Sequence, residues 1–280
     1  MTTMIKRIYF LTSEIVPFAE TYSLATFSKE ISIIFNERKY DFRLMMPKYN
    51  FISERRYILR EVIRLREMDL LYKNQPVKAA VKSAFIPNTK VQVYFLEHNL
   101  YFNLPDNNLY YNEPSNAEQN NASRFGYFAT AALVTLNYLR WKPEVIICND
   151  WQMSLIPLLI NSGQLNPDYL DGVKILQIVH SKSEHALYRR SEYEAIGINN
   201  LNPASTNETI DCLAAALPFC HHTLFINHKE NIWDAFQQDA HFTEILKRDK
   251  KKYSIYNLTG NEPEDWQKLA DEIIALMERM

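Results

Sequence analysis

The strongest constraint in this sequence is the alternation of short apolar runs with helical segments. Residues 5–12 (IKRIYFLT) are typical of a buried strand, and residues 41–46 (DFRLMM) form a second such run that ends at Pro47. Between them, residues 20–37 carry apolar side chains at a helical spacing. A strand, a helix and a strand in this order predict a βαβ unit with parallel strands and a right-handed crossover.

The same alternation continues toward the C-terminus. Residues 56–97 hold several short β-like runs, around 59–65, 77–85 and 91–96, and residues 103–121 are rich in Asn, Asp, Pro and Tyr, which is typical of a loop. Beyond them we expect strands at 144–148, 173–179 and 222–226, and helices at 122–139, 151–161, 207–217, 228–238 and 263–279.

This order of elements predicts an α/β fold with a mostly parallel sheet covered by helices on both faces. No repeat or long linker interrupts it, so we expect one Rossmann-like domain over residues 1–240 and a helical appendage over 241–280 that packs on it. The apolar residues of the last helix share one face, which would contact the domain. They are Trp266, Leu269, Ile273, Ile274 and Met277.

Composition excludes several classes of protein. The formal net charge is −2, which argues against nucleic acid or an anionic membrane as a partner. No apolar stretch approaches the length of a membrane span, and the run at 8–11 is too short for a signal peptide. The three cysteines, Cys148, Cys212 and Cys220, lack metal-ligand spacing. We therefore expect buried free thiols, no metal site and a cytoplasmic location.

Glycine is scarce, with only five residues in 280. Glycine allows backbone to approach a phosphate closely, so such a chain has few places for a phosphate-binding loop. None of the glycine-rich nucleotide-binding motifs, and no G-x-S-x-G motif, occurs.

Four segments resemble the N-terminal domain of bacterial glycogen and starch synthases. The third is the most specific, and with a weaker match at 210–232 they cover roughly residues 5–235. The four segments are 13–19 (SEIVPFA), 93–102 (VYFLEHNLYF), 120–125 (NNASRF) continuing to 141–152 (WKPEVIICNDWQ), and 174–180 (KILQIVH).

The resemblance implies the first half of a GT-B-type glycosyltransferase. Members join two Rossmann-like halves and transfer glucose from ADP-glucose to an α-glucan with retention and without a metal. The second half carries the groups that act on the donor. The matched region here is followed by a short segment only, so we expect a divergent, short paralogue without that half, and enzymatic activity is left open.

The donor-binding loop expected from the resemblance is altered. Where the family has K-T-G-G-L, this chain has Glu20, Thr21, Tyr22, Ser23 and Leu24. Two unit charges about 4 Å apart interact with roughly 4 kcal/mol at an effective dielectric of 20. Replacing the lysine by Glu20 therefore disfavours a diphosphate, and Tyr22 and Ser23 crowd the backbone approach. In the absence of a ligand, Glu20 would act as an acid in the first helical turn.

The second family site follows the strand at 144–148. The resemblance places Asn149 where the family has a histidine that contacts the transferred glucose; an amide can bind a sugar hydroxyl but cannot carry a proton. Asp150 precedes a helix and is interpreted as its N-cap or as a substrate contact. Trp151 either packs under that helix or stacks on a sugar ring.

His180 stands at the carboxyl end of a strand, where open α/β sheets bind ligands. It is a candidate substrate contact, the alternative being a loop or capping histidine. Neither it nor His185 has metal spacing with nearby ligands. We assign no catalytic residue, no cofactor and no metal.

Three functions remain open on the sequence alone. The first is a glycogen synthase-like protein, inactive or weakly active alone, with a glucan-binding or regulatory role and doubtful ADP-glucose binding. The second is an active glucosyltransferase completed by a separate chain. The third is a partner-binding module. The expected partners are an α-glucan or another protein of glycogen metabolism, and a homo-oligomer is not excluded.

Overall fold

The computed structural model describes residues 7–104, 108–111, 120–165, 169–199, 201, 208–248 and 252–280. Its centre is β1 (Arg7–Leu11), followed by α1 (Ser23–Glu37) and β2 (Asp41–Pro47). β1 pairs in parallel with β2, from Arg7 opposite Asp41 to Leu11 opposite Met45. The βαβ opening expected from the sequence is confirmed.

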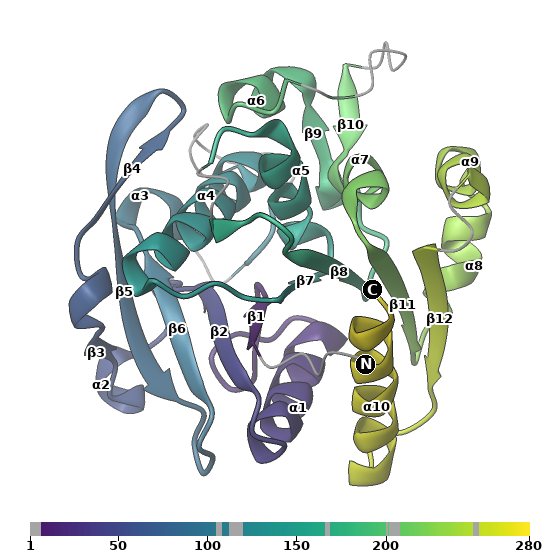
Figure 1. The fold of residues 1–280 in the computed structure, drawn as a ribbon, viewed down its shortest axis with the longest axis horizontal. Coiled ribbons are helices and arrows are strands. Elements are labelled where there is room, and N and C mark those ends of the chain that lie inside the picture. Colours follow the sequence, from purple (N-terminus) through teal and green to yellow (C-terminus); the bar gives the residue numbers. More distant parts are fainter. Residues whose placement is uncertain are drawn as a thin grey trace.

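A ten-stranded, mostly parallel sheet organises the molecule (Figure 1). Its order is β12-β11-β8-β7-β1-β2-β6-β5-β3, and β4 pairs with β5 outside this path. The strands after β2 are β3 (Arg60–Glu61), β4 (Met68–Tyr72), β5 (Gln75–Phe85), β6 (Gln92–Glu97), β7 (Val145–Asn149), β8 (Lys174–Val179), β11 (His222–His228) and β12 (Tyr253–Leu258). β9 (Leu187–Arg189) and β10 (Thr209–Asp211) form a separate hairpin.

Helices cover both faces of the sheet (Figure 1). Successive side chains of β1 point to opposite faces: Phe10 stacks on Phe27 of α1, whereas the Tyr9 hydroxyl donates to the carbonyl of Ala132 in α4. The α-helices after α1 are α2 (Glu54–Tyr57), α3 (Asn99–Phe102), α4 (Asn121–Leu139), α5 (Leu155–Ser162), α6 (Arg190–Ala195), α7 (Cys212–Ala216), α8 (Ile232–Gln237), α9 (Ala240–Arg248) and α10 (Pro263–Arg279).

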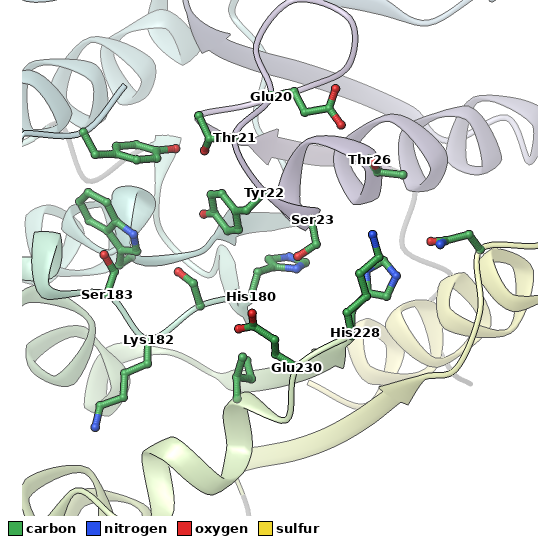
Figure 2. A pocket seen from close by; sticks show the side chains of 16 residues that line it. Glu20, Thr21, Tyr22, Ser23, Thr26, His180, Lys182, Ser183, His228 and Glu230 are labelled. Atoms are coloured by element: carbon green, nitrogen blue, oxygen red, sulfur yellow. The ribbon is translucent and has the colours of Figure 1, made fainter. Parts of the chain in front are cut away.

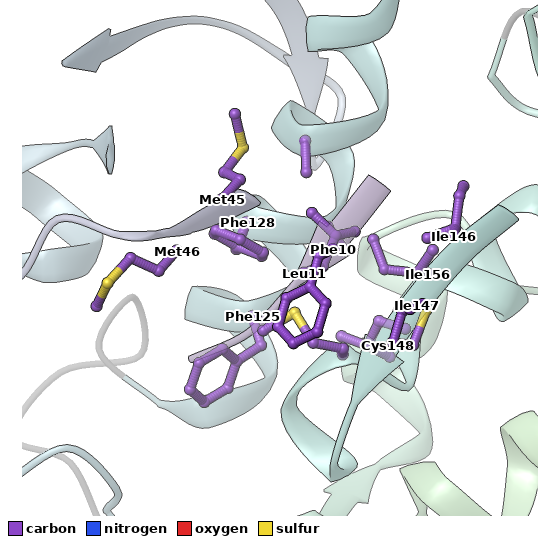
Figure 3. Packing of buried hydrophobic residues seen from close by; sticks show 14 of the residues in the cluster. Phe10, Leu11, Met45, Met46, Phe125, Phe128, Ile146, Ile147, Cys148 and Ile156 are labelled. Atoms are coloured by element: carbon purple, nitrogen blue, oxygen red, sulfur yellow. The ribbon is translucent and has the colours of Figure 1, made fainter. Parts of the chain in front are cut away.

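The core is built from these two layers. Buried apolar side chains of the sheet and of the helices on its two faces form one cluster, which includes Phe10, Met45 and Ile147 of β1, β2 and β7 and Phe125 and Phe128 of α4 (Figure 3). The three cysteines lie buried and unpaired. None of the described helices has the length and apolar character needed to span a bilayer.

Several local expectations need correction. The strand expected around 59–65 is reduced to β3 and a 3₁₀ turn at Ile63–Leu65. The helix expected at 207–217 begins at Cys212, because Thr209–Asp211 pairs with β9. The helix expected at 151–161 is split into a 3₁₀ turn and α5.

The segment 241–280 is not purely helical. β12 lies within it and pairs in parallel with β11, from Thr223 opposite Tyr253 to His228 opposite Leu258. The sequence analysis missed this strand because a single edge strand with few buried side chains carries little periodicity. The division of the chain at residue 240 stays a prediction.

The last helix packs on the first. α10 buries Trp266, Leu269 and Ile273, and the Arg38 guanidinium at the end of α1 lies 2.6 Å from Asp271 and 2.6 Å from the Gln267 amide oxygen. An exposed ion pair contributes little, so the apolar face supplies most of the stabilisation.

The structure predicts unequal effects for neighbouring isoleucines of α10. Ile273 is fully buried, whereas Ile274 is only partly buried. Ile273→Ala should lower the free energy of unfolding by about 3 kcal/mol through lost burial and a residual cavity. Denaturant unfolding measures this, with Ile274→Ala as the control. Equal effects of the two substitutions would contradict the packing of α10 described above.

Candidate functional site

The strand order places a crevice at the carboxyl ends of the central strands. From β1 the chain proceeds outward to β2 and β6, and then returns to β7 on the other side of β1. The loops after β1 and β7 therefore diverge, and open α/β sheets bind ligands at such a point.

A pocket of about 610 Å³ lies there (Figure 2). Loops from four parallel strands line it, together with one residue before α4 and one before α10. The lining residues are Glu20, Thr21, Tyr22, Ser23 and Thr26 after β1; Trp151 after β7; His180, Ser181, Lys182 and Ser183 after β8; His228, Lys229, Glu230 and Ile232 after β11; and Tyr110 and Asn261.

Asp150 does not line the pocket, and its carboxylate binds two residues that do, Tyr22 and Ser181, rather than capping the turn that follows it. Its carboxylate is fully buried and accepts hydrogen bonds from the Tyr22 hydroxyl (2.5 Å), the Ser181 hydroxyl (2.7 Å) and the backbone N–H groups of His180 and Ser181. It makes no capping hydrogen bond to the turn that follows it. The N-cap interpretation is therefore wrong, because the polar groups of two other loops satisfy the carboxylate.

The backbone of Asp150 is also unusual. Its φ of 61° and ψ of −173° lie in a region that side-chain-bearing residues rarely adopt. Two backbone contacts hold it there: its N–H donates to the Ile178 carbonyl, and its own carbonyl accepts from the Gln177 amide. Burial raises the pKa of the Asp150 carboxyl, and the hydrogen bonds from Tyr22 and Ser181 oppose that shift.

A second buried carboxylate holds the loop between β1 and α1. Glu14 is fully buried and accepts from the backbone and the hydroxyl of Thr21 and from the Tyr110 hydroxyl. Burial raises its pKa. Among the described residues no lysine or arginine pairs with Glu14 or Asp150, so neutral donors alone stabilise both. The sequence analysis did not identify Glu14 or Tyr110 as site residues.

Residues 20–23 of the altered loop do not lie where the sequence analysis placed them relative to the first helix. α1 begins at Ser23, and its first turn holds no acidic residue. Glu20 precedes the N-cap position and lies exposed at the pocket rim, so its interpretation as a first-turn helix acid is wrong. Tyr22 occupies the N-cap position in an extended conformation, and its hydroxyl also accepts from the Gln152 amide at 3.1 Å.

Asn149 and Trp151 are less accessible to a ligand in the pocket than their places in the sequence indicate. Asn149 is fully buried, its amide donates to the Leu11 carbonyl at 2.8 Å, and it does not line the pocket. Trp151 lines the pocket but is only 2% exposed, with edge contacts to Tyr110 and Phe125. Most of the Trp151 side chain is therefore packed inside the protein, as one of the two alternatives for this residue predicted.

His180 lies where the sequence analysis placed it, at the end of β8. Its ring packs 4.4 Å from the ring of Phe27, and its Nε2 is buried without a hydrogen-bond partner. Burial, with a smaller contribution from His228, lowers the pKa of His180 to about 3. The imidazole is therefore neutral near pH 7.

The C-terminal segment completes the opposite side of the pocket from Tyr22. His228 at the end of β11 lines the pocket together with Asn261, and its ring meets that of Trp266 edge-on at 5.8 Å. The Trp266 indole N–H donates to the Asn261 carbonyl at 3.2 Å. Sequence reasoning did not identify His228 or Asn261 as lining residues. No local sequence pattern indicates that either lies near His180 in the fold.

The charged lining residues are nearly balanced. Lys182 is already paired with Asp239 at 2.9 Å. Lys229 and Glu230 are adjacent on the loop after β11, and Glu20 stands across the pocket mouth. Among the described residues no three histidine, cysteine or carboxylate side chains cluster closely enough to hold a metal ion.

The sequence is similar to known proteins over most of its length. The family model described as the starch synthase catalytic domain matches residues 7–247. The glycogen synthase of Chlorobium phaeobacteroides is 26% identical over 278 residues, covering 96% of this chain and 55% of that protein. The glycogen synthase of Chlorobaculum parvum is 29% identical over 188 residues, covering 67% and 38%. The chain thus spans about half, or less, of these relatives' length.

A solved structure has the same architecture. The catalytic domain of starch synthase IV from Arabidopsis thaliana, bound to ADP and acarbose, matches with a TM-score of 0.75 and 19% identity, covering 91% of this chain and 52% of that one. At this identity the likeness concerns the fold alone, and it confirms the α/β architecture expected from the sequence.

The buried neutral His180 predicts a pH effect on stability. The unfolded imidazole titrates near pH 6.5 and the folded one near 3, so the stability that its neutral form confers is lost as the pH falls from about 6.5 toward 3. At pH 4.5 this loss amounts to about 3 kcal/mol. His180→Gln should therefore lose less stability than the wild type between pH 7 and 4.5.

Urea unfolding at the two pH values provides the measurement. His241→Gln, on the exposed surface of α9, is the matched control and should behave as the wild type. If the His180→Gln protein lost as much stability on acidification as the wild type, the neutral buried state of His180 would be refuted.

Proposed function

Because this chain belongs to the starch synthase catalytic domain family, we propose that it acts as a glycogen synthase-like protein that binds α-glucan and is inactive, or only weakly active, alone. The resemblance inferred from four short segments is confirmed by the match over residues 7–247. The proposed role within the family is glucan binding or regulation of glycogen metabolism.

The hydrogen bond from the Tyr22 hydroxyl to the Asp150 carboxylate carries this proposal. It fixes a large side chain at the start of α1, where the resemblance implies glycine and close approach of backbone to a diphosphate. A phosphate could reach the N-terminus of α1 only if this charge-assisted bond were broken, which leaves a buried carboxylate with fewer donors.

The charges around the crevice also argue against tight binding of a sugar nucleotide. Glu14 and Asp150 lie buried near the loop, and no lysine or arginine in the described part of the chain forms an ion pair with either. Glu20 stands at the rim in place of the family's lysine, and the ammonium of Lys182 is engaged by Asp239. Lys229 is the remaining cation of the lining and stands next to Glu230, so a diphosphate would meet lining charges that nearly cancel and two buried carboxylates nearby.

The remaining lining suits an uncharged ligand rich in hydroxyl groups. His180 is neutral, and Ser23, Ser181 and Asn261 offer hydroxyl and amide groups at the pocket surface. A pocket of about 610 Å³ is within the range of small-molecule sites, roughly 300–1,000 Å³. An α-glucan has this chemistry and no charge.

The alternative is an active glucosyltransferase that is completed by a separate chain. Two observations favour it. His180 is at the carboxyl end of β8, where open α/β sheets bind ligands, and the matched relatives are about twice as long as this chain. Under this alternative the isolated chain binds ADP-glucose, whereas under the main proposal it does not.

Isothermal calorimetry distinguishes these functions. We expect the chain to bind maltoheptaose and to show no heat with ADP-glucose at concentrations up to the millimolar range. Micromolar binding of ADP-glucose would overturn the main proposal in favour of the transferase. Binding of neither ligand would overturn both glucan and donor recognition and leave a partner-binding module.

Restoring the family's loop should restore some nucleotide affinity. The combined change Glu20→Lys, Tyr22→Gly and Ser23→Gly removes the hydroxyl bound to Asp150 and reverses the charge at the rim. We expect at least a tenfold rise in ADP-glucose affinity, equivalent to about 1.4 kcal/mol. Glu37→Lys, which makes the same charge change at the far end of α1, is the control. An unchanged affinity would refute the steric and charge argument.

A further inference from the structure

A second hollow lies at the amino ends of the parallel strands β2 and β6, whereas the crevice lies at the carboxyl ends of the strands. It has a volume of about 200 Å³ and is formed where β2 and β6 begin, next to the last residue of β5 and the end of α1. The crevice is at the carboxyl ends of the strands, so the two hollows share no residue. Its principal lining residues are Asn36, Tyr40, Phe42, Phe85, Lys90 and Gln92.

Phe85 is the most informative of these residues. Its side chain is 56% exposed, and it is the one aromatic residue among the exposed large apolar side chains of the described chain. Tyr40 and Phe42 also line the hollow, but both of their rings pack on Phe35 of α1 and are only partly exposed. An exposed aromatic surface next to hydrogen-bonding groups is typical of a binding site rather than of a solvated face.

The polar groups of the hollow are mainly neutral. Asn36 and Gln92 contribute amides, and the Gln92 amide nitrogen donates to Ser83, which orients that side chain. Because Gln92 stands opposite Phe85 in the β5–β6 pair, an amide and an exposed ring occupy neighbouring positions. A planar amide beside a ring fits a sugar, whose apolar face stacks and whose hydroxyls hydrogen-bond.

The cations of the hollow argue against an anion as its ligand. The Arg43 guanidinium lies 3.7 Å from Asp41, donates to the Tyr94 hydroxyl and rests on the Trp141 ring. It is therefore neutralised and held in place. Lys90 alone remains at the rim without a carboxylate partner among the described residues, and one exposed ammonium does not make an anion site.

We propose that this second hollow, with Phe85 as its stacking platform, is a surface site for one or two sugar units of a neutral α-glucan chain. It rests on the glucan-binding function proposed above and locates a glucan contact away from the crevice. A volume of about 200 Å³ suits ring-sized units.

The test compares maltoheptaose with β-cyclodextrin, a cyclic glucan without chain ends, by calorimetry on the full chain. The wild type should bind both. Phe85→Ala should weaken β-cyclodextrin binding by at least about fivefold, since an aromatic contact of this kind contributes roughly 1 kcal/mol. Phe85→Trp should retain binding. The control is Ile63→Ala, which removes an exposed apolar side chain outside the hollow.

The outcomes separate this inference from the proposed function. If the wild type binds glucan and Phe85→Ala binds both ligands equally well, the surface site is refuted while glucan binding stands. If the wild type binds neither ligand, the proposed function fails and the surface site fails with it. A loss of binding in Phe85→Ala that Phe85→Trp does not share supports the site, because misfolding would affect both variants.

Discussion

The burial of the Asp150 carboxylate is the constraint on which the rest of the crevice depends. A buried charge is costly unless hydrogen bonds satisfy it, and here the donors come from the loops after β1 and β8 while Asp150 itself follows β7. The two loops that diverge at the switch point, after β1 and β7, are thereby joined to each other and to the loop after β8 through one side chain. The strained backbone of Asp150 is the local cost of aiming its carboxylate at these partners.

This arrangement gives the site an unusual electrostatic character. Glu14 and Asp150 are stabilised by hydroxyl and amide donors rather than by lysine or arginine, and His180 is kept neutral by burial. These donors are already engaged by the two buried carboxylates, and an additional anion would add repulsion in a region of low dielectric constant. The same residues support the proposal that the crevice takes an uncharged ligand rather than a phosphate.

The sequence predicts those parts of the molecule whose signal is local. The periodicity of residues 20–37 and the Pro263 start of the last helix correspond to α1 and α10 within a few residues. β12 escaped prediction because an edge strand is defined by its pairing with β11, and only Leu258 of its six residues is buried. In the site, His180 was identifiable from its place after a strand. The role of Asp150 was not, since Tyr22 lies 128 residues away in the chain.

The seating of Asn261 has a thermodynamic consequence. This residue faces the crevice, and the indole of Trp266 in the first turn of α10 holds its carbonyl. Any molecule that contacts Asn261 from within the crevice therefore binds best when α10 is docked, and by reciprocity its binding lowers the equilibrium population of molecules in which α10 is locally open. Amide hydrogen exchange along residues 263–279 would then report ligand binding in the crevice, although α10 itself does not line the crevice.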